Sequence, residues 1–525
     1  MTSTAPSPTA GPGYASLDPG HDTVQRTEPV LLLDRLLPGR LLSATVLLGL
    51  AGSVLLASTA IGAGGILVTD PLLTGGPLSW MRYGHGRDLA TIALYLGVGM
   101  IVWAWVRLGR DVMAGTATVQ HVLVASAAWV TPMVLSPPLF TRDVYSYLAQ
   151  GALALRGLNP YQVGPSELPP GPIADNVHYA WQTTPAPYGP LFIVIAKTMS
   201  WLTDEDAIAG VIGMRLVLLT GLGLLVFALP RLADQLGGNR TVTLWLVVAN
   251  PLTVVHLVGG PHNDLLMIGL LAVGTLLVLQ HRHVTGIALV TVAMAIKAPA
   301  GIALPFLVWI WTARLPGNRG AALLRAGTGS LAVFTVVFTG ITMLSGVGLG
   351  WISALNAPSL IVNWMSLPTG AGQLVHAVTS PFHDVSSGPF ILVCRILGSG
   401  IFLAVFARQW WLARDGSPDA TRRAAITLLW SALLAPATLP WYLTWALVLA
   451  AAAPWRRSPL AWVVAGSTWL VLATYPTGES AFDSWPYQLG TTAGSLIAAT
   501  ALLHHDPLHV RRRTLRTDPV PATTA

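Results

Sequence analysis

A carboxylate stands next to a guanidinium at the start of an amphipathic stretch. Arg142 and Asp143 precede the run VYSYLAQGALALRG, whose apolar residues recur at helical spacing up to Gly157. A carboxylate held at the end of a helix can take a proton from a hydroxyl group, which makes Asp143 a candidate general base. On these residues alone, capping of the helix by Asp143, or a pair with Arg142, explains the acid equally well.

Two further polar groups interrupt apolar runs. In GGPHNDLLMIGLL, residues His262, Asn263 and Asp264 either cap a helix or offer its N-terminus to an anion, with the imidazole as an additional donor. Lys297 lies in AMAIKAPAG and is one of only two lysines. An unpaired ammonium near the centre of a membrane costs about 2.5–3.5 kcal/mol, so Lys297 either reaches the interface or meets an anion.

Aromatic residues accompany these groups. Tyr188 lies in PAPYGP, and Trp441 and Tyr442 lie in LPWYLTW. They could stack on a sugar or form an aromatic belt at the membrane interface. An acid near cationic groups favours attack by a deprotonated hydroxyl on a centre whose leaving group is an anion. The sequence contains no Cys or His set at zinc spacing, no P-loop and no dinucleotide fingerprint.

The elements that must position these residues are membrane helices. Hydrophobic residues make up 53% of the 525-residue chain and form repeated apolar runs of spanning length. We therefore expect an all-α polytopic membrane protein with about 14 transmembrane helices. They are expected near 41–62, 88–106, 118–137, 207–229, 241–258, 263–280, 284–298, 300–313, 322–345, 389–407, twice within 424–453, and near 458–475 and 486–503. Segment 189–203 is expected to be re-entrant or interfacial, and Pro436 and Pro440 to hinge the pair in 424–453.

Charge sets the expected orientation. The net charge is +7, and arginines gather in short loops and in the C-terminal tail, which suits membrane orientation better than nucleic acid binding. We expect a disordered cytoplasmic tail at 1–40, a transmembrane domain at 41–504 and a basic cytoplasmic tail at 505–525. The large loops near 138–206 and 346–388 would then be extracytoplasmic, together with Asp143 and Lys297.

Four motifs carry a resemblance to a known family. The stretches TRDVYSYLAQGALALRGLNPYQVGP, GGPHNDLLMIGLL, AIKAPAGIALP and LPWYLTW resemble the polyprenol-phosphate-mannose-dependent α-1,6-mannosyltransferases of actinobacterial lipomannan and lipoarabinomannan synthesis. The resemblance runs from about Leu41 to about His504. It implies a C-type glycosyltransferase fold in the plasma membrane, with interfacial helices in the first large extracytoplasmic loop.

The resemblance also implies a reaction. Mannose would move, with inversion, from polyprenyl-phosphate mannose to the 6-hydroxyl of an α-1,6-mannan on a lipid anchor, at the extracytoplasmic face. Asp143 corresponds to the family's catalytic base. Related enzymes can use a histidine in the late external loop; LPWYLTW has none, which directs attention to His262.

The remaining roles follow as hypotheses. We expect the donor phosphate to bind Arg142, Lys297 and His262. The sugar and the acceptor would contact Tyr145, Asn159, Tyr188, Asn263, Asp264, Trp441 and Tyr442. No metal and no other cofactor is expected. The alternatives are a flippase or transporter of a lipid-linked sugar, and a sister transferase that uses another polyprenyl-phosphate sugar; only the resemblance selects mannose.

Overall fold

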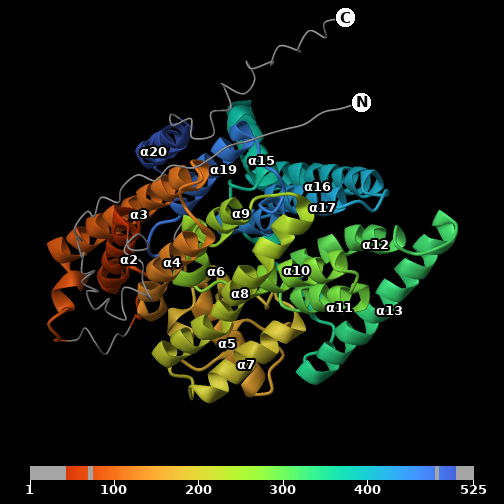
Figure 1. Ribbon diagram of the computed structural model, residues 1–525. Helices are drawn as coiled ribbons and strands as arrows, with labels where there is room; N and C mark the ends of the chain where they lie inside the picture. Colours follow the sequence, from red (N-terminus) through yellow and green to blue (C-terminus); the bar gives the residue numbers. More distant parts are fainter. Residues whose placement is uncertain (1–42, 69–74, 383, 479–483, 504–525) are drawn as a thin grey trace, which may run out of the picture. The chain divides into compact units, whose positions relative to one another are not determined.

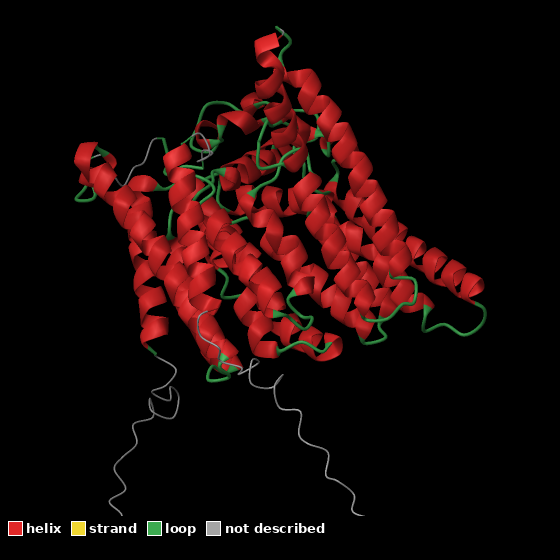
Figure 2. Ribbon diagram, turned by 90° about the horizontal axis from the view of Figure 1, so that it is seen from above, coloured by secondary structure: helices red, strands yellow, loops and turns green. Residues whose placement is uncertain are grey.

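The protein is built from helices. A computed structural model describes residues 43–68, 75–382, 384–478 and 484–503, and in these ranges helices are joined by loops and turns without strands (Figure 2). The all-α prediction is confirmed for this part of the chain. The tails predicted at 1–40 and 505–525, and the boundary residue 504, lie outside the described residues.

The α-helices follow the predicted apolar runs closely. Figure 1 shows where they lie in the structure. The first half contains α2 (Ala44–Ala63), α3 (Gly84–Met113), α4 (Val119–Val130), α5 (Asp143–Leu155), α6 (Tyr179–Gln182), α7 (Pro190–Leu202), α8 (Ala207–Leu236), α9 (Arg240–Val247) and α10 (Asp264–Leu279). The second half contains α11 (His283–Met294), α12 (Leu304–Thr312), α13 (Arg319–Ser345), α14 (Trp351–Ala354), α15 (Leu367–Thr379), α16 (Ser387–Leu412), α17 (Asp419–Leu434), α18 (Leu443–Ala450), α19 (Arg457–Val471) and α20 (Trp485–Leu503).

Short 3-10 and π segments complete the secondary structure. The 3-10 turns are η1 (Ser79–Arg82), η2 (Thr131–Leu135), η3 (Pro165–Glu167), η4 (Ala174–Asn176), η6 (Ala298–Ala303), η7 (Ala357–Leu360), η8 (Ser380–Phe382) and η9 (Pro440–Tyr442), and η5 (Leu252–Gly259) is a π-helix. π-Segments are rare and often occur at functional sites. Here η5 leads directly into the His262 motif.

In the part of the chain that the structure describes, five helices are long and apolar enough to cross a membrane: α2, α3, α8, α13 and α16. The pair α9 and η5 makes a sixth if it is one span, although the two parts are bent by 49°. Pro251 stands between them, and a proline removes a backbone donor and breaks a helix. The structure thus supports an integral membrane protein with five or six spans by length; the count of 14 and the C-type fold stay predictions.

The predicted hinge within 424–453 is present. Helix α17 ends at Leu434 and α18 begins at Leu443, with Pro436 and Pro440 between them. The connection contains the 3-10 turn η9, which carries Trp441. This break brings LPWYLTW against the start of α10 rather than continuing a straight helix.

Glycines let α8 and α10 pack backbone to backbone. A Cβ at Gly221 of α8 would lie 2.3 Å from the carbonyl oxygen of Leu265, and one at Gly269 of α10 would lie 2.5 Å from the carbonyl oxygen of Gly221. Any larger residue at these positions would push the helices apart. The close approach fixes the N-terminal end of α10, where Asp264 begins the helix.

A buried arginine ties together the two segments that carry the polar motifs. Arg215 of α8 is 1% exposed and donates hydrogen bonds to the carbonyl oxygens of Val134, Ser136, Val258 and Gly259 at 2.7–3.0 Å. Carbonyl oxygens therefore satisfy this guanidinium, which makes no ion pair with any residue that the structure describes. The contacts join the chain before Asp143 to the chain before His262.

The backbone turns sharply just before Asp143. Phe140 has φ 58°, a left-handed conformation that costs energy for a residue with a side chain. Its N–H donates to the carbonyl oxygen of Pro476 at 3.1 Å, and its carbonyl oxygen accepts from Thr474 Oγ1 at 3.3 Å. The segment after α19 thus holds the turn that orients the start of α5.

Candidate active site

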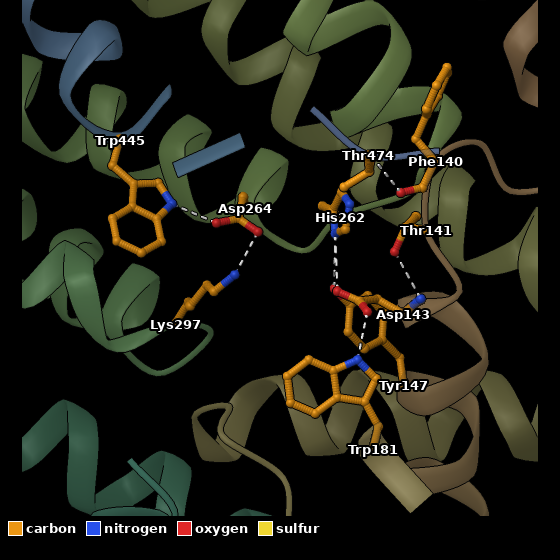
Figure 3. Close-up of polar contacts among 10 residues, drawn as sticks. All are labelled: Phe140, Thr141, Asp143, Tyr147, Trp181, His262, Asp264, Lys297, Trp445 and Thr474. Carbon is orange, nitrogen blue, oxygen red and sulfur yellow. Dashed lines mark hydrogen bonds and ion pairs between the residues drawn. The ribbon is translucent and has the colours of Figure 1, made fainter. Parts of the chain in front are cut away.

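The Asp143 carboxylate is held from several directions (Figure 3). Asp143 is the first residue of α5, and its N–H donates to Thr141 Oγ1 at 3.0 Å. Trp181 Nε1 donates to Oδ1 at 3.0 Å, while His262 Nδ1 lies 3.6 Å from Oδ2. The residue is 8% exposed. No arginine is paired with it among the described residues, so a pair with Arg142 does not explain the acid.

Burial changes the acidity of this group. Desolvation raises the pKa of Asp143 to about 6, because an apolar environment disfavours the charged form; the Lys297 ammonium and the Trp181 hydrogen bond act in the opposite direction. A carboxylate with a pKa near 6 is ionised at neutral pH and is a better proton acceptor than an ordinary one. These properties are the ones that a general base requires.

His262 lies behind Asp143 rather than at a substrate surface. Its ring is fully buried and stacks on Trp441, with centroids 3.5 Å apart and an interplanar angle of 22°. The Tyr147 hydroxyl lies 3.4 Å from Nδ1, the same nitrogen that faces Asp143. His262 is not among the residues that line the cavity described below, so its position suits orientation of Asp143 better than the phosphate contact expected from the sequence.

Lys297 meets a carboxylate. Its Nζ lies 2.6 Å from Oδ2 of Asp264, whose Oδ1 accepts a hydrogen bond from Trp445 Nε1 at 2.5 Å (Figure 3). Asp264 is fully buried and begins α10, where its negative charge also interacts favourably with the helix dipole. Lys297 is therefore the cation of a buried ion pair. Its partner is Asp264, which was expected to contact the sugar or the acceptor.

Three aromatic rings surround the ammonium group. The Lys297 Nζ lies 5.7, 5.2 and 5.7 Å from the ring centroids of Tyr188, Tyr442 and Trp445. These distances allow cation–π attraction, which together with Asp264 holds the ammonium in place. The aromatic motifs singled out in the sequence therefore converge on this lysine.

A glycine makes the approach of Tyr188 possible. Gly189 N–H donates to the carbonyl oxygen of Ile296 at 3.0 Å, and Leu191 N–H donates to that of Ala295 at 2.9 Å. A Cβ at Gly189 would lie 2.3 Å from the Ala295 carbonyl oxygen. The motif PAPYGP thus fastens the start of α7 to the turn before Lys297.

Asp143 and Lys297 open into the same cavity. Its volume is about 340 Å³. The lining also includes Trp181, Pro187, Tyr188, Ala298, Pro299, Ile302, Leu355, Ile361, Ser431, Ala435, Pro436, Ala437, Leu439, Trp441, Tyr442 and Trp445. A base and a cation thus share one largely apolar chamber with aromatic walls, which is the usual composition of a ligand site.

Four other residues expected at the site do not line this cavity. Arg142 donates to the carbonyl oxygens of Asn176 and Ile66 and to Asn176 Oδ1, so all three of its nitrogens make hydrogen bonds within the protein. The Tyr145 hydroxyl donates to the Gly65 carbonyl oxygen at 2.8 Å. Asn159 bonds the backbone of Val347 and Tyr161, and Asn263 is fully buried and not among the residues lining the cavity.

Three residues at the site were not singled out from the sequence. Trp181 bonds Asp143 from 38 positions away in the chain, and Tyr147 and Trp445 contact His262 and Asp264. Trp181 lies in the four-residue helix α6, which is too short for a periodic pattern, so no spacing relates it to Asp143. Tyr147 could have been found, because it lies one helical turn after Asp143 on the same face.

Comparison with known proteins identifies the family. A model of the α-(1→6)-mannopyranosyltransferase N-terminal domain matches residues 46–313, and a model of the MptB C-terminal domain matches residues 368–504. The chain belongs to the α-(1→6)-mannopyranosyltransferase family. It is accordingly a glycosyltransferase, and the resemblance inferred from the four motifs is confirmed.

Individual members of the mannosyltransferase family are similar over most of their length. The chain is 42% identical to α-(1→6)-mannopyranosyltransferase A of Mycobacterium tuberculosis over 455 residues, which cover 86% of this chain and 88% of that protein. It is 32% identical to the enzyme of the same name from Corynebacterium glutamicum, over 73% of this chain and 83% of that one. No solved structure matches. Asp143 and Lys297 lie within the region matched by the N-terminal domain model, and the cavity residues from Ser431 to Trp445 lie within the region matched by the C-terminal domain model.

Proposed function

We propose that this mannosyltransferase moves mannose, with inversion, from polyprenyl-phosphate mannose to the 6-hydroxyl of an α-1,6-mannan on a lipid anchor. The observation that carries the proposal is the shared cavity, in which the Asp143 carboxylate and the Lys297 ammonium both face one chamber of about 340 Å³. Acid–base chemistry at one end and charge stabilisation at the other are what glycosyl transfer from a phosphate donor needs.

Asp143 is the proposed base. It takes the proton from the acceptor hydroxyl as that oxygen bonds to C1 of mannose, and the bond from C1 to the phosphate oxygen breaks with its electron pair. Attack from the face opposite the phosphate inverts the configuration at C1. Trp181 and His262 hold the carboxylate in position for this step.

Lys297 is the proposed phosphate ligand. Asp264 engages one of the ammonium protons, and Lys297, not Asp264, lines the cavity. An ammonium group has three donors, so two are available for phosphate oxygens. Stabilising the negative charge that develops on the departing phosphate lowers the barrier to transfer.

The rest of the cavity suits a lipid. Ile302, Leu355 and Leu439 supply aliphatic walls, and the prolines at 187, 299 and 436 add apolar surface. A nucleotide-linked sugar would bring a base and a second phosphate, for which the cavity lining offers only one cation. A polyprenyl chain requires apolar contacts alone, which favours a lipid-linked donor.

The distribution of arginines supports an extracytoplasmic site. Helix α10 has Asp264 at its first residue and Arg282 beyond its last; α11 begins beside Arg282 and ends before Lys297. Helix α17 carries Arg423 in its early turns and leads into the cavity wall at Ala435. The arginines thus mark helix ends opposite to the site, and arginine-rich ends face the cytoplasm. We propose that the enzyme lies in the plasma membrane with its site on the extracytoplasmic face.

The test is transfer by the purified protein in lipid vesicles. Radiolabelled polyprenyl-phosphate mannose and a short α-1,6-linked mannose oligosaccharide are supplied, and the product is digested with an α-1,6-specific mannosidase. The proposal expects a labelled product that is sensitive to this digestion and forms equally in EDTA. Label that crosses the vesicle membrane without a new glycosidic bond would instead identify a flippase, and transfer of another sugar in place of mannose would identify a sister transferase.

A further inference from the structure

A second cavity adjoins the one described above. Its volume is about 350 Å³. Asp143, Trp181, Ile361, Leu439 and Trp441 line both cavities. The carboxylate therefore lies on the boundary between two chambers, and a group bound in either one can approach it.

The two cavities differ in the charges they offer. Besides Asp143, the first contains Lys297, whereas the charged residue of the second is Arg142. Arg142 Nε donates to the Asn176 carbonyl oxygen at 3.0 Å, Nη1 to that of Ile66 at 3.0 Å, and Nη2 to Asn176 Oδ1 at 2.7 Å. Backbone and amide oxygens already engage three of the five N–H donors of this guanidinium. Of the two cavities, the second is therefore the better suited to a neutral molecule.

The walls of the second cavity are polar and aromatic. Thr141, Asn363, Gln373 and Thr474 bring hydroxyl and amide groups, and Tyr179, Trp181, Trp364 and Trp441 bring rings. The first cavity also has aromatic walls, but aliphatic residues and prolines supply most of the rest of its lining. Flat rings interleaved with neutral hydrogen-bonding groups match a sugar, which has apolar C–H faces and a rim of hydroxyls.

Two lining residues have buried polar atoms that the protein leaves without a hydrogen bond. Among the described residues, neither the Gln373 Oε1 acceptor nor the Trp441 Nε1 donor has a partner. A buried polar atom without a partner costs free energy, so a ligand that supplies one is favoured. A hydroxyl group can donate to an amide oxygen and accept from an indole N–H, whereas an ammonium or a carboxylate can do only one of these.

We propose that this second cavity is the acceptor site, where the neutral, non-reducing end of a saccharide binds with its reacting hydroxyl at Asp143. The inference rests on the proposed transferase function and deepens it, because it assigns the two substrates to opposite sides of one carboxylate. The lipid-linked donor occupies the Lys297 chamber, and the acceptor oxygen reaches C1 across Asp143. Trp181, which bonds Oδ1 and belongs to both walls, keeps the carboxylate on this boundary.

The experiment compares one variant in each cavity. Gln373→Leu removes the amide from the second cavity, and Ser431→Leu adds bulk to the first, where the Ser431 hydroxyl donates to the Leu428 carbonyl oxygen of its own helix. Gln162→Leu makes the same exchange as Gln373→Leu at an exposed residue. For each purified protein we measure the Kd for a short α-1,6-linked mannose oligosaccharide by calorimetry and the KM for each substrate in the transfer assay.

We expect Gln373→Leu to raise the oligosaccharide Kd and the acceptor KM about tenfold, with the donor KM unchanged. Ser431→Leu should raise the donor KM and leave the oligosaccharide Kd unchanged, and Gln162→Leu should change neither. If Gln373→Leu fails to fold, Trp364→Ala tests the same wall. The assignment would be overturned if Gln373→Leu changed the donor KM alone, or changed the binding of neither substrate. It would also be overturned if the wild type bound no oligosaccharide.

The calorimetric arm separates this inference from the proposed function. Binding that is weakened by Gln373→Leu supports the acceptor site even in a protein that transfers no mannose. In that case the proposed reaction fails, and the saccharide site stands.

Discussion

At the scale of single residues, the site depends on two buried charges with different supports. Asp143 is held by hydrogen-bond donors and by burial, whereas Lys297 is held by an opposite charge. Replacing either residue should therefore have a different consequence. Loss of the Asp143 carboxylate should impair mannosyl transfer, whereas loss of the Lys297 ammonium should impair both transfer and the stability of the fold.

The raised pKa of Asp143 predicts a pH dependence. Burial raises the pKa to about 6, so the carboxyl group is protonated below that pH and cannot accept the acceptor's proton. We expect kcat/KM to be level above pH 7 and to fall about tenfold per unit well below pH 6. A pH–rate profile in reconstituted vesicles measures this. A level profile between pH 4.5 and 8 would exclude Asp143 as the titrating base.

The ion pair between Lys297 and Asp264 predicts that stability and transfer activity can be separated by mutation. Lys297→Met leaves Asp264 as an unpaired buried charge, which should destabilise the fold by about 3–5 kcal/mol and abolish transfer. In Lys297→Met with Asp264→Asn, the remaining amide oxygen still accepts from Trp445, so thermal stability should recover. Transfer should stay lost, because the phosphate ligand is missing. Recovery of activity in the double variant would show that the pair is only structural.

His262 predicts an effect on rate without an effect on donor binding. Its Nδ1 lies 3.6 Å from Asp143 Oδ2, and its ring stacks on Trp441. We expect His262→Phe, which keeps a flat ring, to lower kcat at least tenfold, leave the donor KM unchanged and move the acid limb of the pH profile. A rise in donor KM alone would restore the phosphate-binding role expected from the sequence.

At the scale of elements, close backbone contacts bring distant motifs together. Gly189 fixes α7 to the turn before Lys297, and Arg215 fixes the segments before Asp143 and His262 to each other. None of these contacts can be predicted from the spacing of residues within one helix, because each joins segments that are far apart in the sequence. The site is thus assembled by helix ends and loops.

Gly189 predicts a cost of overpacking. An added Cβ would lie 2.3 Å from the Ala295 carbonyl oxygen, so Gly189→Ala should move Tyr188 away from Lys297. We expect a loss of about 1–3 kcal/mol in stability and a higher donor KM. Gly99→Ala in α3 is the matched control, because a Cβ there has nothing within 4 Å. Equal melting temperatures for the two variants would contradict the packing argument.

Sequence patterns predicted the elements better than their connections. Apolar runs located the helices to within a few residues, because burial in lipid or in a helical core leaves a continuous signal. The same runs did not reveal the bend at Pro251 or the short length of helices such as α11. Of the site, the motif residues Asp143, Lys297 and Tyr188 meet in one cavity, but the hydrogen bonds of Arg142 and the approach of Trp181 arise only from tertiary folding.

At the scale of the whole molecule, an extracytoplasmic site and cytoplasmic arginines place the cavity and the arginine-bearing helix ends on opposite sides of the membrane. A single native cysteine, Cys394, makes this testable. In a Cys394→Ser background, Gln162→Cys should react with a membrane-impermeant maleimide in intact cells. Asp415→Cys, which is exposed near the arginines after α16, should react only after permeabilisation. The reverse pattern would place the site in the cytoplasm and exclude a lipid donor presented from outside.

Proton transfer by the Asp143 carboxylate can be tested by measuring the rate of mannosyl transfer in Asp143→Asn. Asp88→Asn in α3, at a side chain that is 76% exposed, makes the same change away from the site and serves as the control. With both variants folded and inserted, we predict a fall of about 10²–10⁴-fold for Asp143→Asn and an unchanged rate for Asp88→Asn. A rate near that of the wild type in Asp143→Asn would contradict the account.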